Sequence, residues 1–327
     1  MSSRAEPLKV TVSTLTRKRP KMLEALLKSW GDMTIPADCE IGFLVVENDN
    51  VPSSKEVVEG CGPNLKNGAP IQYVLETEQG IPFGRNRAAR EALKDGADLL
   101  CFVDDDEVVA LDWLDRMIAG YRASSAVLLG APLRAAAPTG SETAMQRIML
   151  KNIDYRYMRK EQVAARKATL DDTGGVTIVT NNWLGETRLF SEKGIWFDES
   201  MRLTGGTDAK FYGEVVAAGM PVGWVSDAFV YETVPAERLS FWYQVGRGRD
   251  QSNTHLRRKL DQKPLKAMLT FLTVPILLVA LIAQFVLLPF QPNKRLIELA
   301  RTFGRVIGIL GVLVGYKSKL YKQVSGV

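Results

Sequence analysis

Four consecutive acidic residues follow an apolar run in the first third of the chain. Residues 99–103 read LLCFV, and Asp104, Asp105, Asp106 and Glu107 come directly after them. An apolar run of this length is typical of a buried strand, and acids at its end need a cation to offset the cost of burial. Carboxylate oxygens suit Mg²⁺ or Mn²⁺, ions that proteins often share with the phosphates of a nucleotide. The cluster therefore predicts a divalent-metal site, with a solvated acidic turn as the alternative.

The segments around the acids alternate between strand and helix patterns. Residues 8–14, 40–47 and 72–77 are predicted strands, and helices are predicted from Pro20 and over residues 85–94. Such units favour an α/β fold with a mainly parallel sheet and helices on both faces. Ligands bind at the carboxyl ends of such strands, so we expect the polar residues that follow each strand to converge on one pocket.

Residues 84–87 (GRNR) lie at the predicted start of a helix, where backbone N–H groups and guanidinium groups could hold phosphates. A solvated helix face is the alternative interpretation. The chain has no GxxxxGK[ST] loop and no GxGxxG after its first predicted strand. A P-loop NTPase and a dinucleotide-dependent dehydrogenase are therefore disfavoured.

The composition predicts a globular chain with a substantial core. Of 327 residues, 46% are hydrophobic and 24% charged, and the net charge of +5 fits nucleic acid, an anionic membrane or phosphorylated substrates equally well. The three cysteines lack metal-type spacing, which indicates a reducing compartment. The single histidine, His255, disfavours histidine-based zinc sites. No N-terminal signal peptide is expected.

Five short blocks in order resemble family 2 glycosyltransferases with the GT-A fold, especially bacterial exopolysaccharide and succinoglycan-type enzymes that extend a lipid-linked sugar. The blocks are residues 12–14 (VST), 45–49 (VVEND), 84–87 (GRNR), 102–106 (FVDDD, with a DXD motif) and 205–208 (GGTD). The family usually has two acids where this chain has Glu47 and Asn48, and more often Glu where it has Thr207. The resemblance implies an α/β, GT-A fold, Rossmann-like, over residues 8 to about 250.

The resemblance also implies site residues. The donor-binding set would be Thr14, Glu47, Asn48, Arg85, Asp104 and Asp105. Asp106, with Asp104, would bind Mg²⁺ or Mn²⁺ between the two donor phosphates. A divalent ion and arginines would stabilise the charge that develops on a leaving nucleoside diphosphate.

Asp208 would be the general base that deprotonates the acceptor hydroxyl, with inversion at the anomeric carbon. The alternative is a helix N-cap ahead of residues 209–218. Asn182 and Trp183, after an apparent strand over residues 176–180, are expected to line the sugar or acceptor site. For Trp183, core packing is the alternative.

The composition changes after the predicted catalytic region. A cationic collar over residues 247–266 precedes residues 267–290, which carry no formal charge and are long enough to cross a bilayer. Arg247 and Arg249 are expected to contact the acceptor diphosphate, with general lipid attraction as the alternative. The charge pattern favours a re-entrant or shallow hairpin followed by an interfacial helix, and two full crossings remain the alternative.

The expected organisation is a catalytic domain over residues 1–245, a basic juxtamembrane segment over 246–264, and membrane-embedded and interfacial helices over 265–327. The expected function is metal-dependent inverting transfer of a hexose from a nucleotide-diphosphate sugar, with a UDP-sugar favoured as the donor. The expected acceptor is a polyprenyl-diphosphate-linked glycan in bacterial exopolysaccharide or cell-surface glycan synthesis. The expected location is the cytoplasmic face of the inner membrane, with anionic lipids and no nucleic acid as partners. The alternative is a noncatalytic, membrane-docked subunit with the same fold, although intact Asp104, Asp106 and Asp208 favour the enzyme.

Overall fold

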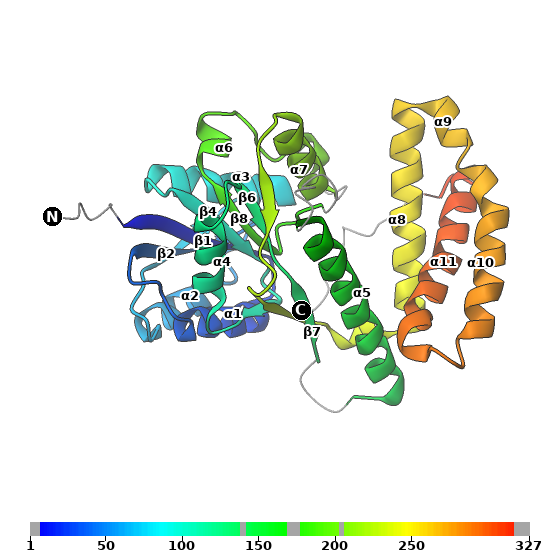
Figure 1. Ribbon diagram of the computed structural model, residues 1–327, viewed down its shortest axis with the longest axis horizontal. Helices are drawn as coiled ribbons and strands as arrows, with labels where there is room; N and C mark the ends of the chain where they lie inside the picture. Colours follow the sequence, from blue (N-terminus) through cyan, green and yellow to red (C-terminus); the bar gives the residue numbers. More distant parts are fainter. Residues whose placement is uncertain (1–6, 138–141, 169–176, 203–205, 317–327) are drawn as a thin grey trace. The chain divides into compact units, whose positions relative to one another are not determined.

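The computed structural model describes residues 7–137, 142–168, 177–202 and 206–316 (Figure 1). The described residues form two compact units. We call residues 7–134 and 158–232 the sheet unit, and residues 135–157 and 233–316 the helical unit.

A seven-stranded sheet forms the centre of the sheet unit, with strand order β3-β2-β1-β4-β8-β6-β9. Strands β1, β2, β3 and β4 are parallel, and β6 is parallel to β9, whereas β8 is antiparallel to both β4 and β6. The strands are β1 (Leu8–Thr16), β2 (Cys39–Glu47), β3 (Ile71–Leu75), β4 (Leu99–Val103), β6 (Leu128–Gly130), β8 (Asn182–Glu186) and β9 (Val222–Trp224). The predicted α/β class with a mainly parallel sheet is confirmed.

A smaller sheet has the order β5-β10-β7, with β5 (Glu107–Val109), β10 (Val230–Thr233) and β7 (Leu133–Ala136). The helices that begin in the sheet unit are α1 (Pro20–Asp32), α2 (Lys55–Cys61), α3 (Ile81–Lys94), α4 (Trp113–Arg122), α6 (Arg188–Ser191) and α7 (Thr207–Ala217). Helix α5 (Ala144–Ala168) begins in the helical unit and ends in the sheet unit. The predicted apolar face of α1 is confirmed, because its leucines and tryptophan are all buried: Leu23, Leu26, Leu27 and Trp30.

Several predicted boundaries differ from the structure, among them the end of β3, which lies at Leu75 and not at residue 77. Strand β1 runs to Thr16, because the alternation of β-branched residues continues past Thr14. Helix α3 begins at Ile81 with a proline in its first turn, so residues 84–87 lie inside the helix. The prediction of a strand over residues 176–180 is wrong for residues 177–180, which lie outside any strand; residue 176 is outside the described residues. The strand begins at Asn182 instead.

The helical unit contains α8 (Phe241–Gln262), α9 (Pro264–Met268), α10 (Val274–Leu287) and α11 (Pro292–Leu313), and α11 packs against both α8 and α10 (Figure 1). Glycines permit the close approach of α8 and α11. A Cβ atom at Gly304 would collide with the Val245 carbonyl oxygen, and one at Gly308 with the Arg249 carbonyl oxygen. The two backbones therefore touch where no larger residue fits.

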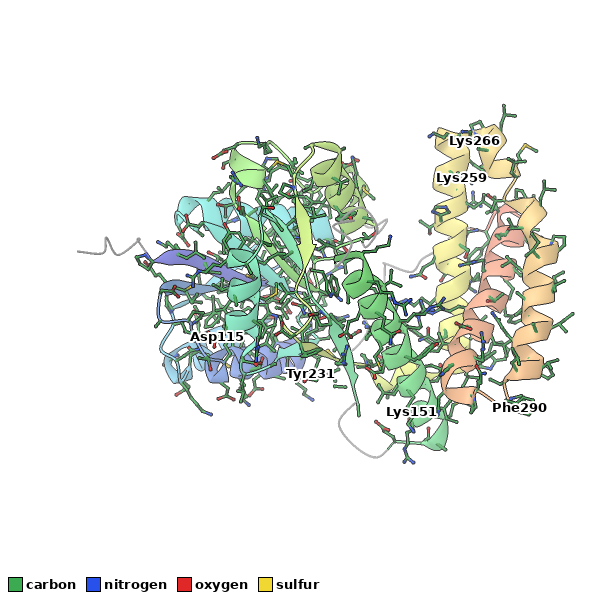
Figure 2. The ribbon with its side chains drawn as sticks, viewed as in Figure 1. Asp115, Lys151, Tyr231, Lys259, Lys266 and Phe290 are labelled. Atoms are coloured by element: carbon green, nitrogen blue, oxygen red, sulfur yellow. The ribbon has the colours of Figure 1, made fainter. Side chains whose placement is uncertain are left out.

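Within the described residues, one helical segment, Pro264–Leu287, is long and apolar enough to cross a membrane by length and composition. Its mean hydropathy is 2.4 over the most apolar window, and none of that window is buried. Pro275 lies in the first turn of α10, so it does not kink the middle of the helix. Figure 2 shows Lys259 and Lys266 at one end of the helical unit and Phe290 at the other.

Candidate active site

The acid cluster follows β4 and is bound by two side chains from the end of β1. The Thr16 hydroxyl donates to Asp105 Oδ2 at 2.8 Å. Arg19 Nη1 donates to Asp105 Oδ1 at 2.7 Å and to Asp106 Oδ2 at 3.3 Å. Burial raises the pKa of Asp105, and the Arg19 guanidinium opposes this rise. Arg19 therefore supplies part of the positive charge that these acids require.

Neither Thr16 nor Arg19 is marked by a sequence motif as a site residue. The signal for Thr16 is the strand pattern, because β1 extends beyond Ser13, its last residue paired with β4, and so reaches the acids. Arg19 stands just before α1 at a position that no motif marks. Only the fold brings it to the acids.

Asp104 lies between the acid cluster and a second charged group. Burial raises its pKa to about 7; Arg85 lowers the pKa, whereas Asp106 and Asp208 raise it further. Its strongest electrostatic neighbours therefore come from α3 and α7 as well as from its own loop. The Asp104 backbone N–H donates to Glu107 Oε2 at 2.8 Å, which orders this turn.

The second group is an ion pair between Arg85 on α3 and Asp208 on α7. Arg85 Nη1 also donates to the Thr207 hydroxyl at 3.1 Å, and the Thr180 hydroxyl donates to Asp208 Oδ1 at 3.2 Å. Helix α7 begins at Thr207, and its N-cap is Gly206 with φ of 84°. The alternative that Asp208 is an N-cap is therefore wrong: it lies in the first turn. Gly205 is outside the described residues.

Lys160 adds a cation beside this pair. Its ammonium lies 5.8 Å from the centre of the Trp224 ring. Burial lowers the pKa of Lys160, and the Asp208 carboxylate opposes that change. No sequence motif pointed to this residue.

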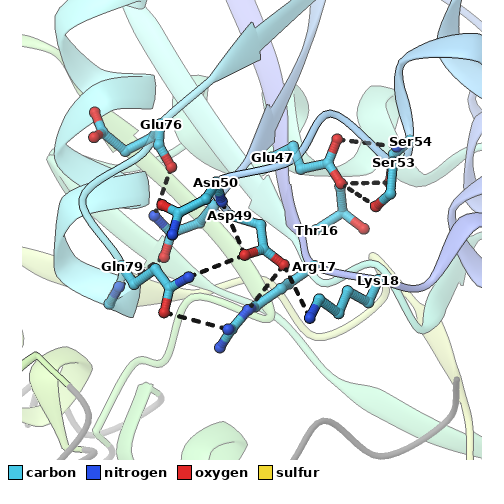
Figure 3. Close-up of polar contacts among 12 residues, drawn as sticks. Thr16, Arg17, Lys18, Glu47, Asp49, Asn50, Ser53, Ser54, Glu76 and Gln79 are labelled. Carbon is cyan, nitrogen blue, oxygen red and sulfur yellow. Dashed lines mark hydrogen bonds and ion pairs between the residues drawn. The ribbon is translucent and has the colours of Figure 1, made fainter.

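The carboxylate of Glu47, a residue predicted to bind the donor, is bonded to groups of the protein itself. The side chain is fully buried. Its carboxylate accepts hydrogen bonds from the Ser54 backbone N–H at 2.9 Å, the Tyr73 hydroxyl at 2.6 Å, and both neighbouring serine hydroxyls (Figure 3). The protein itself satisfies this carboxylate.

Asn48, also predicted to bind the donor, is likewise bonded to the protein. Its Nδ2 donates to the carbonyl oxygens of Glu76 at 3.1 Å and Glu78 at 2.7 Å, and its Oδ1 accepts from the Gly80 N–H at 2.8 Å. These bonds tie the end of β2 to the loop before α3. Asn48 therefore shapes this loop.

Asp49, the next residue, anchors polar groups at the same edge. It accepts from Gln79 Nε2 at 2.9 Å and Arg17 Nε at 3.4 Å, and Lys18 Nζ lies 3.7 Å from its Oδ2 (Figure 3). Although burial raises the pKa of Asp49, the Asn50 N–H and Arg17 bring it below its usual value. Arg17 and Lys18 thus place positive charge at the carboxyl ends of β1 and β2.

Three further residues predicted to line the site are buried. Thr14 is fully buried inside β1, and its hydroxyl oxygen is a buried polar atom without a hydrogen-bond partner among the described residues. Asn182 and Trp183 are each 1% exposed. Asn182 bonds to Trp113 Nε1 and to two backbone carbonyls, and Trp183 packs against two aromatic rings, Phe102 and Phe211. Both are core residues because β8 is a central strand.

The backbone of residues 84–87 does not hold phosphate in the way predicted, because the helix begins before it. The Gly84 N–H already donates to the Gly80 carbonyl oxygen at 3.4 Å. The Arg85 side chain remains at the site through its pair with Asp208.

Arg247 and Arg249 belong to the helical unit. Arg249 Nε and Nη2 donate to the two carboxylate oxygens of Asp250 at 2.9 Å and 3.1 Å, and its guanidinium lies over the Tyr316 ring. The Nε and Nη2 groups of Arg249 are therefore engaged in a bidentate contact within the helical unit.

The carboxylates of the site suit a divalent ion that also binds the phosphates of a nucleotide. Among the described residues, no group of three His, Cys, Asp or Glu side chains could hold a metal by itself. Mg²⁺ and its close relatives commonly take only one or two protein carboxylates, with phosphates and water completing the shell. Asp104 and Asp106 can supply that number, and the Arg19 contact shows that this position favours positive charge.

Residues 11–184 match the family model of glycosyl transferase family 2. The chain belongs to glycosyltransferase family 2. Within this family it is 28% identical over 253 residues to the succinoglycan biosynthesis protein ExoM of Rhizobium meliloti (strain 1021), covering 77% of this chain and 75% of that protein. It is thus a glycosyltransferase family 2 enzyme with an α/β, GT-A-like fold.

Solved structures of similar fold support the architecture. A mannosyltransferase, PcManGT from Pyrobaculum calidifontis, solved with GDP-Man and Mn²⁺, has a TM-score of 0.55 at 14% identity, covering 96% of this chain and 77% of that chain. S. aureus TarS 1-349 with UDP-GlcNAc has a TM-score of 0.50 at 14% identity, covering 98% and 95%. The chain spans only 44% of the longer TarS structure.

Proposed function

We propose that this glycosyltransferase family 2 enzyme is a metal-dependent inverting hexosyltransferase. Its donor would be a nucleotide-diphosphate sugar, with UDP-sugars tested first, and its acceptor a polyprenyl-diphosphate-linked glycan in exopolysaccharide or cell-surface glycan synthesis. The position of Asp104 carries the proposal. Asp104 neighbours both Asp106 and the Arg85–Asp208 pair, so the proposed ligands of a phosphate-bound metal and the proposed proton acceptor belong to one site. The similarity to ExoM supports the exopolysaccharide setting.

Asp208 is the proposed general base. Among the described residues, the hydrogen bonds to its carboxylate from Arg85, Thr180 and Thr207 all go to Oδ1. These bonds hold Oδ1 in place, and Oδ2 would then be the oxygen that accepts the proton. Asp208 would take the proton of the acceptor hydroxyl as that oxygen attacks the anomeric carbon from the face opposite the diphosphate, which inverts the configuration.

Asp104 and Asp106 would hold Mg²⁺ or Mn²⁺. When bound, such an ion stabilises the negative charge of the departing nucleoside diphosphate. Arg19 pairs with Asp105 and Asp106, whereas Arg85 pairs with Asp208 and also lowers the pKa of Asp104. The two guanidinium groups would thus offset the mutual repulsion of these acids.

The proposed domain organisation keeps the boundaries expected from the sequence, with catalysis in residues 1–245 and membrane attachment through residues 246–327. The apolar side chains of α10 support it, because Ile276, Val279 and Ile282 are each more than 60% exposed. Exposed apolar side chains that are this closely spaced are typical of a surface that contacts a membrane or a protein instead of water. Four residues separate the end of α10 from the start of α11, and α11 carries charged side chains. Both features support a shallow hairpin followed by an interfacial helix. Two full crossings remain the alternative.

We place the catalytic domain on the cytoplasmic face of the inner membrane, bound to anionic lipids through the cationic collar.

The experiment that tests the proposal is a donor screen. The full chain in detergent is incubated with UDP-sugars and GDP-mannose, with a membrane extract as acceptor, and release of nucleoside diphosphate is measured. One donor should be consumed in a manner that requires Mn²⁺ or Mg²⁺ and the extract, and NMR of the product should show inversion. Release from none of the donors would favour the noncatalytic subunit, and retention would contradict single displacement.

A further inference from the structure

Asn86 on α3 is buried and joins this helix to a segment distant in the chain. It is 2% exposed. Its Nδ2 donates to the Phe197 carbonyl oxygen at 2.9 Å, and its Oδ1 accepts from the Phe197 N–H at 3.0 Å. Nδ2 also donates to Glu199 Oε1 at 2.9 Å. The amide therefore holds the backbone of Phe197 by both its donor group and its acceptor oxygen, which an aspartate, having no N–H, cannot do.

The Phe197 ring packs against both elements that lead to the acids of the site. It is buried, and it stacks on the Phe211 ring of α7 with 4.4 Å between ring centres and 17° between ring planes. It also meets the Phe102 ring of β4 edge-on, with 6.2 Å between ring centres. Phe102 lies two positions before Asp104, and Phe211 lies three positions after Asp208. The position of this one ring therefore affects both β4 and α7.

The same ring supports the guanidinium of Arg85. Arg85 Cζ lies 5.5 Å from the centre of the Phe197 ring. Arg85 Nη1 donates to the Thr207 hydroxyl at 3.1 Å and pairs with Asp208. The guanidinium is thus held between an aromatic face and the first turn of α7. Because a close-packed interior transmits small displacements, a shift of the ring would also displace the ion pair.

We propose that Asn86 is a positioning residue for the Arg85–Asp208 pair. It acts through Phe197: the amide fixes the backbone of Phe197, the ring supports Arg85, and Arg85 orients the carboxylate of the proposed base. The inference rests on the proposed function and deepens it, because it gives Asn86, the residue after Arg85 on α3, a part in the same site. A catalytic group misplaced by about 1 Å can lower a rate about a hundredfold.

The first arm of the test compares the rate of transfer with nucleotide affinity in the full chain in detergent. Asn86→Asp nearly keeps the shape of the side chain but loses the N–H donors. Release of nucleoside diphosphate from the sugars of the donor screen should be slower by about tenfold to a hundredfold, whereas the affinity for UDP with Mn²⁺ should stay within about threefold. If Asn86→Asp does not fold, Asn86→Ser replaces it, because it removes the same donors without adding a charge.

Asn67→Asp is the matched control in the sheet unit. The Asn67 amide also donates to backbone carbonyl oxygens, those of Trp30 at 2.6 Å and Met33 at 3.4 Å, at the end of α1. The control should keep both the rate and the affinity. An unchanged rate in Asn86→Asp, or a loss of UDP affinity as large as the loss of rate, would overturn the proposal.

The second arm needs no sugar transfer. Unfolding midpoints are measured for the unmodified chain, Asn86→Ser, Asp208→Asn and the double variant. Substitutions that share no partners usually have additive effects on stability. If Asn86 positions the ion pair, the midpoint shift caused by Asp208→Asn should differ between the unmodified chain and Asn86→Ser. Equal shifts would overturn the proposal. Unequal shifts in a chain that consumes no donor would support the role of Asn86 and contradict the proposed function alone.

Discussion

Arg85 and Asp208 form an ion pair in the sheet unit although 123 positions separate them in the chain. Arg85 is also 5.5 Å from the centre of the Phe197 ring, so its guanidinium is held by an aromatic face as well as by a carboxylate. The pair joins α3 to the first turn of α7. It thereby places the proposed general base beside the proposed metal-binding acids.

Asp208→Asn should separate catalysis from binding. We expect nucleotide-sugar affinity within a few-fold of the unmodified chain and a rate of transfer lower by about 10²–10⁴, the usual range for loss of a positioned base. Single-turnover kinetics and donor titrations measure the two quantities. Asp115→Asn on α4 is the matched control and should keep full activity. Normal transfer by Asp208→Asn would remove this residue from the mechanism.

Chelation should abolish transfer, and Mn²⁺ or Mg²⁺ should restore it. Asp106→Asn should weaken both metal and donor binding, because one anionic oxygen ligand is lost while the shape is nearly kept. Calorimetric titration of Mn²⁺ and of donor with Mn²⁺ checks this. Asp112→Asn, an exposed residue ahead of α4, controls for the loss of one charge. Full activity of Asp106→Asn in excess chelator would exclude the metal role.

Metal affinity should depend on pH through Asp104. Without metal, burial raises the pKa of Asp104 to about 7, so a proton competes with the ion below that pH. Mn²⁺ affinity should therefore rise as the pH increases through about 7. The stability of the metal-free protein should change in the opposite direction. The native state keeps a proton on Asp104 that the unfolded chain loses above the usual pKa of 3.8. The free energy of unfolding should therefore fall as the pH rises from 3.8 to about 7. Asp104→Asn should remove the trend in Mn²⁺ affinity and reduce the trend in stability, to which the raised pKa values of Asp105 and Glu107 also contribute. An unchanged trend in Mn²⁺ affinity would assign it to another group.

The contact between α8 and α11 should tolerate no side chain at Gly304. Gly304→Ala should lower the free energy of unfolding of the helical unit by about 1–3 kcal/mol or more, because its Cβ meets backbone atoms that cannot move aside. Gly246→Ala, on α8 with open space around the added carbon, should be neutral or slightly stabilising. Chemical denaturation compares the two variants. Equal free energies of unfolding for Gly304→Ala and Gly246→Ala would contradict the close contact between α8 and α11.

Membrane attachment should depend on the exposed side chains of α10. Val279→Lys combined with Ile282→Lys should leave folding nearly unchanged, because both side chains are exposed, but should move the protein out of the membrane fraction. Val51→Lys places the same change at an exposed position in the sheet unit and should not affect fractionation. Fractionation in high salt checks the result. Retention of the double variant in membranes would show that the anchor lies elsewhere.

The sequence by itself determined the elements and the chemistry of the central acids. The alternation of apolar strands and amphipathic helices predicts a mainly parallel sheet, and four acids after β4 mark the edge at which ligands bind. These features are local, because hydrophobic period and strand length depend on neighbouring residues. The exposed apolar segment after the basic collar is visible in the same way.

The tertiary structure decided which polar side chains face the site and which serve the fold. Glu47 and Asn48 follow a strand as a donor-binding pair would, yet serines, a tyrosine and loop backbone take their hydrogen bonds. Asn182 and Trp183 became core residues because β8 lies between two other strands. Arg19 reached the acids, and Arg85 reached Asp208, only through contacts between segments distant in the chain. Residue type and spacing identify groups that can do chemistry, but long-range packing determines which partners satisfy them, because a buried polar group takes whichever partner the fold brings within hydrogen-bonding distance.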